Sequence, residues 1–304
     1  MVASSSRYRV VCLVGLLYQA NAWLLHGTRR AQVTDLKRYG PWAVIAGGSE
    51  GVGAAFATQL AEAGLNLVLV ARKPGPLERT AALARESGVE VRTLSADLTD
   101  PAAVAGIIAA TDDIDVGLLI YNAGANSYGS EFVLGDLARF RSVIDLNITA
   151  QLALVHHFGA RMRAAGRGGL LLVGSMSGFL GGYHQTVYAG VKAFGRLFAE
   201  SLWLELREHG VDVLELVLGV TRTPAMERAG LNFDVPGMRV GDPADVAREG
   251  LEHLPDGPLW IAGGNADAVA KRNGLDRAPL LLASHERMRK LFQARHTPAT
   301  GSKG

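Results

Sequence analysis

The sequence predicts an α/β fold: a single domain in which a doubly wound parallel sheet is covered by helices on both faces. Short apolar runs alternate along the chain with longer stretches of helical periodicity, as expected for strand–helix–strand units. A glycine-rich turn, GGSEGVG at 47–53, lies between the first apolar run and the first helical stretch. A Tyr and a Lys four residues apart, in YAGVK, are a third distinctive feature.

Composition agrees with this prediction. The chain has 304 residues, of which 48% are hydrophobic, enough to bury one large core. Its net charge is +2 and no block of like charges occurs, so no nucleic-acid partner is expected. The one cysteine, Cys12, excludes an intrachain disulfide and a metal site built from cysteines. We expect no metal.

The predicted elements alternate throughout. Strands are expected at 42–46, 67–70, 91–95, 116–121, 169–173, 213–217 and 259–261. Helices are expected at 54–64, 101–110, 136–165, 187–208 and 243–253, the last with Asp242 as its N-cap. In such a fold a ligand lies beyond the carboxyl ends of the strands, where Gly47, Asn122, Ser175 and Gly219 all fall.

The glycine-rich turn predicts a dinucleotide site. Gly47 permits a tight turn, Gly51 lets the backbone approach a pyrophosphate, and Gly53 lets the helix pack on the strand. The positive end of the helix dipole then faces the phosphates.

The end of the second strand indicates which dinucleotide is bound. An acid there would accept hydrogen bonds from a free ribose 2′-hydroxyl, but the strand runs into Ala71, Arg72 and Lys73. Arg72 can pair with a 2′-phosphate, so we favour NADP(H) over NAD(H). The alternative is that Arg72 and Lys73 are solvated loop charges, and Glu50 in the turn also opposes phosphate binding.

Ser175, Tyr188 and Lys192 form a candidate proton-transfer set. Tyr188 and Lys192 lie at i,i+4 and share a helix face, while Ser175 ends the preceding apolar run. A phenol has a pKa of about 10, and a neighbouring ammonium lowers it. We therefore expect Tyr188 to exchange the proton, Lys192 to lower the pKa of Tyr188, and Ser175 to hold the substrate oxygen.

These motifs together resemble the short-chain dehydrogenase/reductase family, over residues 39–264. The family's glycine motif appears as AGGSEGVG, followed by ADLTD, YNAG, DLNITA and LGVTRT in the family's order. Ala46, Tyr121 and Leu218 depart from the family pattern at support positions. The resemblance implies a Rossmann fold, and the branch that most resembles this chain reduces steroid ketones and long-chain 3-ketoacyl thioesters.

The resemblance also implies roles for individual residues. Ser175, Tyr188, Lys192 and Asn147 would be catalytic, with Lys192 also on the nicotinamide ribose and Asn147 holding a water beside it. The implied cofactor-binding residues are Gly47, Ser49, Gly51, Val52, Gly53, Arg72, Asp97, Leu98, Asn122, Ala123, Gly124, Tyr188, Lys192, Gly219, Thr221 and Thr223.

The segment 223–240 occupies the position of the family's mobile substrate lid. Met226, Leu231, Phe233, Val235 and Met238 would give it an apolar inner surface for a hydrophobic substrate, or would simply pack the lid down.

The predicted function is therefore NADP(H)-dependent interconversion of a ketone and a secondary alcohol on a steroid, fatty-acyl or polyketide-like substrate. A non-enzymatic NADP(H)-binding scaffold or sensor, and an isomerase or dehydratase on the same fold, are the alternatives. The resemblance implies a homodimer or homotetramer formed through the two long helices.

The two ends fall outside the predicted catalytic domain, 39–264. Residues 1–38 are interpreted as an extension or a packing helix in a cytoplasmic protein; the alternative is a membrane anchor at 10–25 that keeps the catalytic domain in the cytosol. Residues 265–304 are expected to form a helical extension, which covers the substrate cleft or joins a partner subunit, and then a disordered tail.

Overall fold

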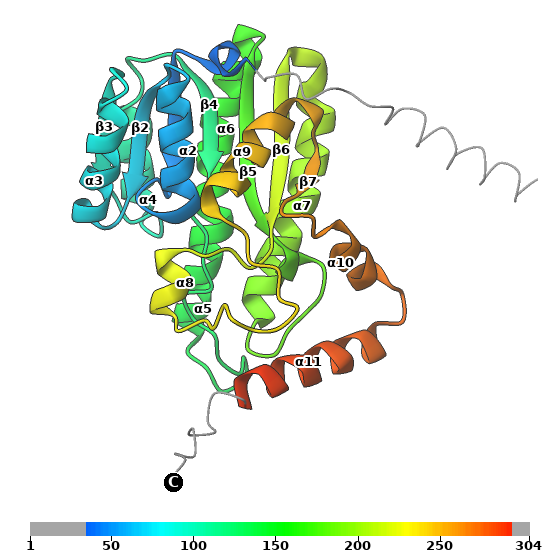
Figure 1. The fold of residues 1–304 in the computed structure, drawn as a ribbon. Helices are drawn as coiled ribbons and strands as arrows, with labels where there is room; N and C mark the ends of the chain where they lie inside the picture. The colour runs from blue at the N-terminus through cyan, green and yellow to red at the C-terminus, as the bar shows by residue number, and fades with distance from the viewer. Residues whose placement is uncertain (1–34, 294–304) are drawn as a thin grey trace, which may run out of the picture. The chain divides into compact units, whose positions relative to one another are not determined.

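A seven-stranded parallel sheet forms the centre of the computed structural model, which describes residues 35–293 (Figure 1). The strand order is β3-β2-β1-β4-β5-β6-β7, and every neighbouring pair is parallel. The strands are β1 Trp42–Ala46, β2 Asn66–Ala71, β3 Val91–Ser95, β4 Val116–Tyr121, β5 Gly168–Ser175, β6 Val211–Leu218 and β7 Leu259–Ile261. The predicted doubly wound Rossmann fold is confirmed.

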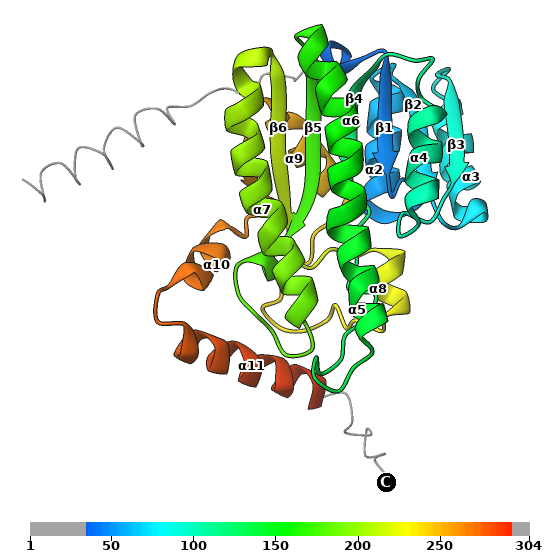
Figure 2. The same ribbon diagram turned by 180° about the vertical axis from the view of Figure 1, so that it is seen from behind.

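Helices cover both faces of this sheet. In Figure 1, α2 and α9 lie in front with α3 beside them, and Figure 2 shows α4, α6 and α7 on the opposite face. The helices are α2 Gly51–Glu62, α3 Pro74–Arg85, α4 Pro101–Ala109, α5 Leu137–Ile144, α6 Ala150–Ala165, α7 Thr186–Leu206, α8 Pro224–Arg228, α9 Pro243–His253, α10 Ala266–Ala270 and α11 Arg277–Gln293.

The core consists of two apolar layers, one on each face of the sheet. Every residue of β1 and β4 is buried, because both strands lie in the middle of the sheet under helices on both sides. Phe56 of α2 and Leu251 of α9 belong to one layer, and Phe158 of α6 and Leu206 of α7 belong to the other. The layers hold the carboxyl ends of the strands at one edge of the sheet.

Strand order reverses between β1 and β4. The chain leaves β1 toward β2 and β3, and β4 to β7 lie on the other side of β1. Crevices for ligands form at such a reversal, outside the carboxyl ends of the strands. In Figure 1 this edge faces down, and α5, α8, α10 and α11 lie below it.

The seven predicted strands are confirmed, with ends shifted by no more than two residues. α2 begins at Gly51, inside the glycine turn, and α3 was not expected. The predicted helix 136–165 is wrong in one respect, because a π-helical turn, Asp145–Thr149, separates α5 from α6. Its physical cause involves the site and is given below.

The compact unit begins at Asp35, four residues before the predicted boundary at 39. Leu36–Tyr39 form a 3₁₀ turn, and Tyr39 is buried against the sheet. The Tyr39 hydroxyl donates to Asp212 Oδ2 at 2.6 Å, and Arg38 pairs with the same oxygen. These residues therefore support the amino end of β6 and belong with the catalytic unit.

The predicted C-terminal helix is present as α11, and the tail after Gln293 lies outside the described residues. The apolar stretch 10–25 also lies outside them. Within the part of the chain that the structure describes, no helix is both long and apolar enough to span a bilayer.

The cap of α9 gives a prediction about stability. Asp242 Oδ1 accepts from the backbone N–H groups of Ala244 and Asp245, at 2.8 and 3.3 Å. Asp242→Ala leaves both groups without this partner, so we expect a loss of about 0.5–2 kcal/mol in the free energy of unfolding. Denaturant titrations measure it. Asp242→Asn is the control and should stay close to wild type, since Asn caps as well as Asp; equal losses in both variants would contradict the prediction.

Candidate active site

The glycine turn after β1 packs directly against the turn after β4. Gly47 has φ +88°, and a Cβ there would lie 2.7 Å from the backbone nitrogen of Ala123. Gly51 has φ +58°, and a Cβ there would lie 2.9 Å from Cγ2 of Thr223. A Cβ at Gly53 would collide with the Gly47 carbonyl. Only glycine fits at these three positions. The sequence predicted such a steric requirement for Gly47 and Gly53.

Hydrogen bonds join the two turns at the reversal of strand order. The Ala46 carbonyl accepts from the backbone N–H groups of Asn122 and Ala123, at 2.9 and 2.7 Å. Asn122 Nδ2 donates to the Gly47 carbonyl at 2.8 Å. Asn122 and Ala123 therefore fix the shape of the turn from the other side of the crevice.

The N-terminus of α2 suits an anion. Glu50 occupies the N-cap position but makes no side-chain capping bond, so the first N–H groups of α2 lack a side-chain partner. Ser49 and Val52 lie at this end, and Thr80 of α3 donates to the Ser49 carbonyl at 3.0 Å. Val52 is buried in the core layer beneath the turn.

The Glu50 carboxylate would repel an anion at this N-terminus, but an arginine pairs with it. Both terminal nitrogens of the Arg228 guanidinium, on α8, contact the Glu50 carboxylate, and Nη1 lies 3.0 Å from Oε2. The pairing raises the pKa of Arg228, chiefly through the hydrogen bond to Glu50. Sequence reasoning treated Glu50 as an unpaired charge and missed Arg228, which lies 178 residues later in the chain.

The end of β2 presents Arg72 beside Asp97. The Arg72 side chain is 64% exposed, and its Nη1 lies 3.7 Å from Asp97 Oδ2. Asp97 Oδ1 accepts from the backbone N–H and the hydroxyl of Thr99, at 3.0 and 2.9 Å. Leu98 is buried in the core layer under this loop. A cation and a positioned carboxylate thus flank the place where adenosine binds in such folds.

Ser175, Tyr188 and Lys192 converge at the carboxyl end of β5. Ser175 is the last residue of β5, and Tyr188 and Lys192 share one face of α7. Ser175 Oγ accepts from the backbone N–H of Ser177 at 3.1 Å, and the Ser175 side chain acts to lower the pKa of the neighbouring Tyr188. Lys192 Nζ donates to the Val173 carbonyl at 3.0 Å and lies 5.8 Å from the centre of the Tyr188 ring.

The expected lowering of the Tyr188 pKa is wrong for the protein alone. Burial raises the pKa of the Tyr188 phenol, and the hydrogen bond with Ser175 offsets only part of that rise. Lys192 is itself affected, since burial lowers its pKa to about 8. The spacing of Tyr188 and Lys192 predicted that the two side chains are neighbours. It could not predict their burial, which raises the pKa of Tyr188 and lowers the pKa of Lys192.

Asn147 lies in the π-helical turn, close to Lys192. Its Nδ2 donates to the carbonyls of Val143 and Ala125, at 2.9 and 3.3 Å. The Tyr121 hydroxyl donates to the Leu146 carbonyl at 2.6 Å. The carbonyls of Val143 and Leu146, beside and within the irregular turn, thus have side-chain partners, which stabilises the break between α5 and α6. Tyr121, a departure from the family pattern, is therefore a support for this turn.

Asn147 and Lys192 meet over Gly124. A Cβ at Gly124 would lie 2.8 Å from Asn147 Oδ1 and 2.8 Å from Lys192 Nζ. Asn147 is buried, and its Oδ1 has no hydrogen-bond partner. The predicted catalytic residues are thus brought together around one point.

The segment after β6 closes the far side of the crevice. Thr223 Oγ1 accepts from the Met226 backbone N–H at 3.3 Å and thereby caps α8. Thr221 is buried, and its hydroxyl contacts the Gly219 carbonyl at 3.4 Å. All three positions predicted from this segment, Gly219, Thr221 and Thr223, lie along the same edge as the glycine turn.

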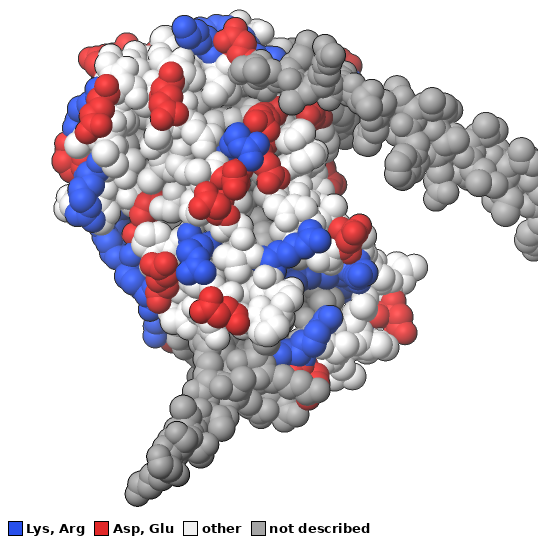
Figure 3. All heavy atoms as spheres, in the orientation of Figure 1, with Lys and Arg blue, Asp and Glu red and all other residues white. Residues whose placement is uncertain are grey.

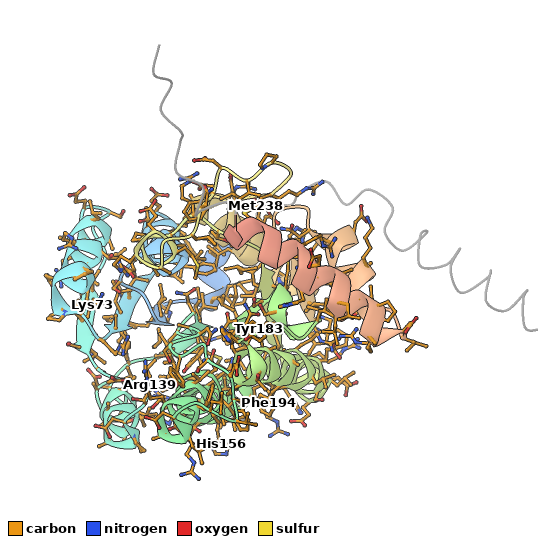
Figure 4. The ribbon with its side chains drawn as sticks, turned by 90° about the horizontal axis from the view of Figure 1, so that it is seen from below. Lys73, Arg139, His156, Tyr183, Phe194 and Met238 are labelled. Carbon is orange, nitrogen blue, oxygen red and sulfur yellow. The ribbon has the colours of Figure 1, made fainter. Side chains whose placement is uncertain are left out.

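The C-terminal segment holds the loop that follows Ser175. Arg272 donates to the Met176 carbonyl at 2.8 Å, and Arg277 donates to the Phe179 carbonyl at 2.9 Å. The rings of Tyr183 and His285 lie 5.3 Å apart. Figure 4 views this edge from below and shows α11 crossing it, with Tyr183 labelled beside it.

Charged side chains of both signs lie on the face of the molecule that carries α2 and α9 (Figure 3). On the face drawn in Figure 3, acidic and basic side chains are interspersed. Among the residues that the structure describes, no group of three His, Cys, Asp or Glu side chains could hold a metal.

Sequence reasoning missed one titratable residue of the site. Glu215 is buried in β6 and lines a cavity of about 10 Å³ together with Asn147, Gln151 and Lys192. Its signal was visible, because a single acid interrupts the apolar run VLELVL.

The residues present fit a nicotinamide dinucleotide. The glycine turn holds its backbone at the crevice with three glycines that no other residue could replace, and the N-terminus of α2 keeps N–H groups without side-chain partners. Ser175, Tyr188 and Lys192 lie beyond the adjacent strands, where the reacting end of such a molecule would lie.

Comparison with known proteins agrees with this geometry. The family model described as short chain dehydrogenase matches residues 41–232. A 7β-hydroxysteroid dehydrogenase of Clostridium sardiniense is 31% identical over 247 residues, which are 81% of this chain and 94% of that protein. A very-long-chain 3-oxoacyl-CoA reductase of Podospora anserina is 32% identical over 260 residues, 79% of this chain and 73% of its own.

Two solved structures resemble the whole catalytic unit. A 7β-hydroxysteroid dehydrogenase superposes with a TM-score of 0.73 at 30% identity, covering 84% of this chain and 98% of its own. A short-chain dehydrogenase from Sphingobium yanoikuyae in complex with NADPH superposes with a TM-score of 0.68 at 30% identity, covering 86% of this chain and 99% of its own. Because the family model spans the glycine turn, Ser175, Tyr188 and Lys192, and the relatives cover most of the chain, this chain belongs to the short-chain dehydrogenase/reductase family of oxidoreductases.

Proposed function

We propose that this chain is an NADP(H)-dependent oxidoreductase that interconverts a ketone and a secondary alcohol on a hydrophobic substrate. The observation that carries the proposal is the convergence of Ser175, Tyr188, Lys192 and Asn147 at the carboxyl edge of the sheet, beside the glycine turn. NADPH would supply the hydride for reduction, and all proton chemistry would fall to the protein.

Tyr188 is the general acid of this proposal. In reduction its hydroxyl proton passes to the substrate oxygen, and in oxidation the phenolate takes a proton from the alcohol. The Ser175 hydroxyl donates to the same oxygen and stabilises the negative charge that develops there. The Lys192 ammonium favours the phenolate, and Asn147 sits beside it with a free amide oxygen that can accept from a water linking Lys192 to solvent.

NADP(H) is preferred over NAD(H) in this proposal because of Arg72. The largely exposed guanidinium at the end of β2 is able to turn from Asp97 toward a 2′-phosphate. Glu50 weakens this preference less than its sequence position suggests, because Arg228 pairs with its carboxylate. The NADPH complex of one structural relative is consistent with this choice.

A hydrophobic substrate fits the lid at 223–240. Leu231, Phe233, Val235 and Met238 are partly buried, while the residues between them are mostly exposed, so one side of the segment is apolar. Met226 differs from its predicted place, since it is 42% exposed. A hydroxysteroid and a very-long-chain 3-oxoacyl thioester, named in two relatives, are both largely apolar.

Two further features follow from this proposal. The contacts of Arg272, Arg277 and His285 with the loop after Ser175 favour the C-terminal segment as a cover for the substrate cleft. Leu197 and Leu204 on α7 are exposed on the face of a long helix, which supports a homodimer or homotetramer through α6 and α7.

The role of Tyr188 is tested by Tyr188→Phe, which keeps the ring and removes the transferable proton. We expect turnover with a panel of ketones to fall by about 100-fold or more, with NADPH affinity retained. Tyr39→Phe is the matched control, because it removes a tyrosine hydroxyl at the opposite edge of the sheet and should keep wild-type turnover. Near-normal turnover in Tyr188→Phe would show that another group supplies the proton. Substrate conversion without net nicotinamide oxidation would instead indicate an isomerase or dehydratase.

Cofactor preference is tested by binding constants for NADPH and NADH. A charge-assisted contact from Arg72 should favour NADPH by about ten- to a hundred-fold. Ala71→Asp combined with Arg72→Ser should reverse the preference, since the new carboxylate repels a phosphate and accepts from a free hydroxyl. Arg163→Ser, which removes an exposed arginine near the other edge of the sheet, should change neither constant. Equal wild-type affinities would identify Arg72 as a solvated loop charge.

The N-terminal segment is tested by fractionation. We propose that the residues before Asp35 are an extension or packing segment, in a cytoplasmic protein. A chain that starts at Val33 keeps the whole compact unit from Asp35. We expect it and the full chain to stay in the supernatant after centrifugation with membranes, with equal turnover. If only the full chain sediments with membranes, the segment 10–25 is an anchor.

A further inference from the structure

Glu215 is a charged residue in the middle of the sheet. It is 2% exposed and lies between Leu214 and Leu216, both fully buried, in β6. Because side chains alternate along a strand, Glu215 projects from the face opposite these leucines, toward α7. Burying a carboxyl group costs several kcal/mol unless a nearby charge or hydrogen bond compensates for it.

The surrounding backbone leaves space for this side chain. Glycines stand on both neighbouring elements: a Cβ at Gly174 of β5 would collide with the Glu215 carboxyl group, and one at Gly195 of α7 would lie 3.4 Å from its Oε1. The Glu215 carboxyl group therefore occupies space that the methyl group of an alanine at position 174 would fill.

The space around Glu215 belongs to the active site. Glu215 and Lys192 line the same cavity of about 10 Å³, together with Asn147 and Gln151. Glu215 Oε2 and Asn147 Oδ1 are both buried without a hydrogen-bond partner. The cavity is about the size of one water molecule and has enough polar groups around it to bind one.

The charges facing Glu215 come from α7. Lys192 and Arg196 favour its ionised form, and Glu200 opposes it. Gln151 and Asn147, on the side of α6, are neutral. Lys192 is therefore the charge that connects Glu215 to the reacting groups, since Tyr188 lies on the same helix face.

We propose that Glu215 is a positioning residue of this active site, whose negative charge keeps Lys192 in the ammonium form. The inference rests on the proposed function only in its consequence for turnover. In this proposal the Glu215 carboxyl group loses its proton first as pH rises, and the negative charge so formed stabilises the positive charge of Lys192, which therefore loses its own proton at higher pH. Without that carboxylate, the first proton to leave comes from Lys192 itself.

The direction of the titration follows from the burial of both groups. Burial lowers the pKa of Lys192 to about 8, and the charge of Glu215 opposes that fall. Burial likewise raises the pKa of Glu215 to about 8, and Lys192 opposes that rise. The two groups thus titrate as a coupled pair in the range where the enzyme must keep its ammonium.

Glu215→Gln tests the inference, because it keeps the shape and removes the charge. Lys192 is one of six lysines, so its side-chain NMR signal in the cofactor-free protein can be assigned by its absence in Lys192→Met. We expect the titration midpoint of Lys192 to fall by about one unit or more in Glu215→Gln, the effect of losing one buried opposite charge. The alkaline decline of the ketone reduction rate should move to lower pH by the same amount. Glu205→Gln removes an exposed carboxylate of α7 and should move neither.

An unchanged Lys192 midpoint in Glu215→Gln overturns the inference whether or not turnover is seen. If the titration midpoint of Lys192 shifts but the pH profile of the ketone reduction rate does not, the active-site role of Glu215 is overturned. If Glu215→Gln does not fold, the wild-type protein decides: the Lys192 signal should change only at a pH above that at which the Glu215 carboxyl signal changes, and a Lys192 titration at or below the carboxyl titration overturns the inference. Failure of the proposed function is distinct, because wild-type protein would then show no nicotinamide turnover while the NMR titration stays readable.

Discussion

The close contact between the turn after β1 and the turn after β4 is the constraint on which the rest of the site depends. The Ala46 carbonyl accepts from two successive N–H groups of the β4 turn, and Asn122 donates back to Gly47. Gly47 makes this approach possible, since any Cβ would collide with Ala123. The two joined turns lie where the strand order reverses, between β1 and β4. The N-terminus of α2, whose first N–H groups lack a side-chain partner, lies at the same place.

A second constraint is electrostatic. The site places a phenol, an ammonium and a carboxyl group in surroundings that desolvate all three. Burial favours the neutral form of each group, and Lys192 and Glu215 each oppose that effect on the other. The protonation states of Tyr188 and Lys192 therefore depend on how the surrounding residues bury them, and not only on the spacing of the two side chains.

The sequence predicted the sheet and the proximity of Tyr188 and Lys192 well, because both depend on local patterns. Apolar runs and the spacing of Tyr188 and Lys192 are properties of neighbouring residues. What it could not predict depends on distant parts of the chain or on solvation. Arg228 pairs with Glu50 across 178 residues of chain, and the Tyr121 hydroxyl of β4 donates to the Leu146 carbonyl in the π-helical turn. The raised pKa of Tyr188 arises from burial. Glu215 was visible as an acid in an apolar strand, but its neighbour Lys192 became apparent only in three dimensions.

The anchoring of the loop after Ser175 bears on how the protein is made. The carbonyls of Met176 and Phe179 accept from Arg272 and Arg277, across 96 and 98 residues of chain. During synthesis the sheet up to β5 can pair long before these arginines leave the ribosome, because domains form from the N-terminus onward. The loop beside Ser175 is therefore held in place only in the last stage of synthesis, so a nascent chain already folded over most of its sheet still lacks the contacts that fix this loop.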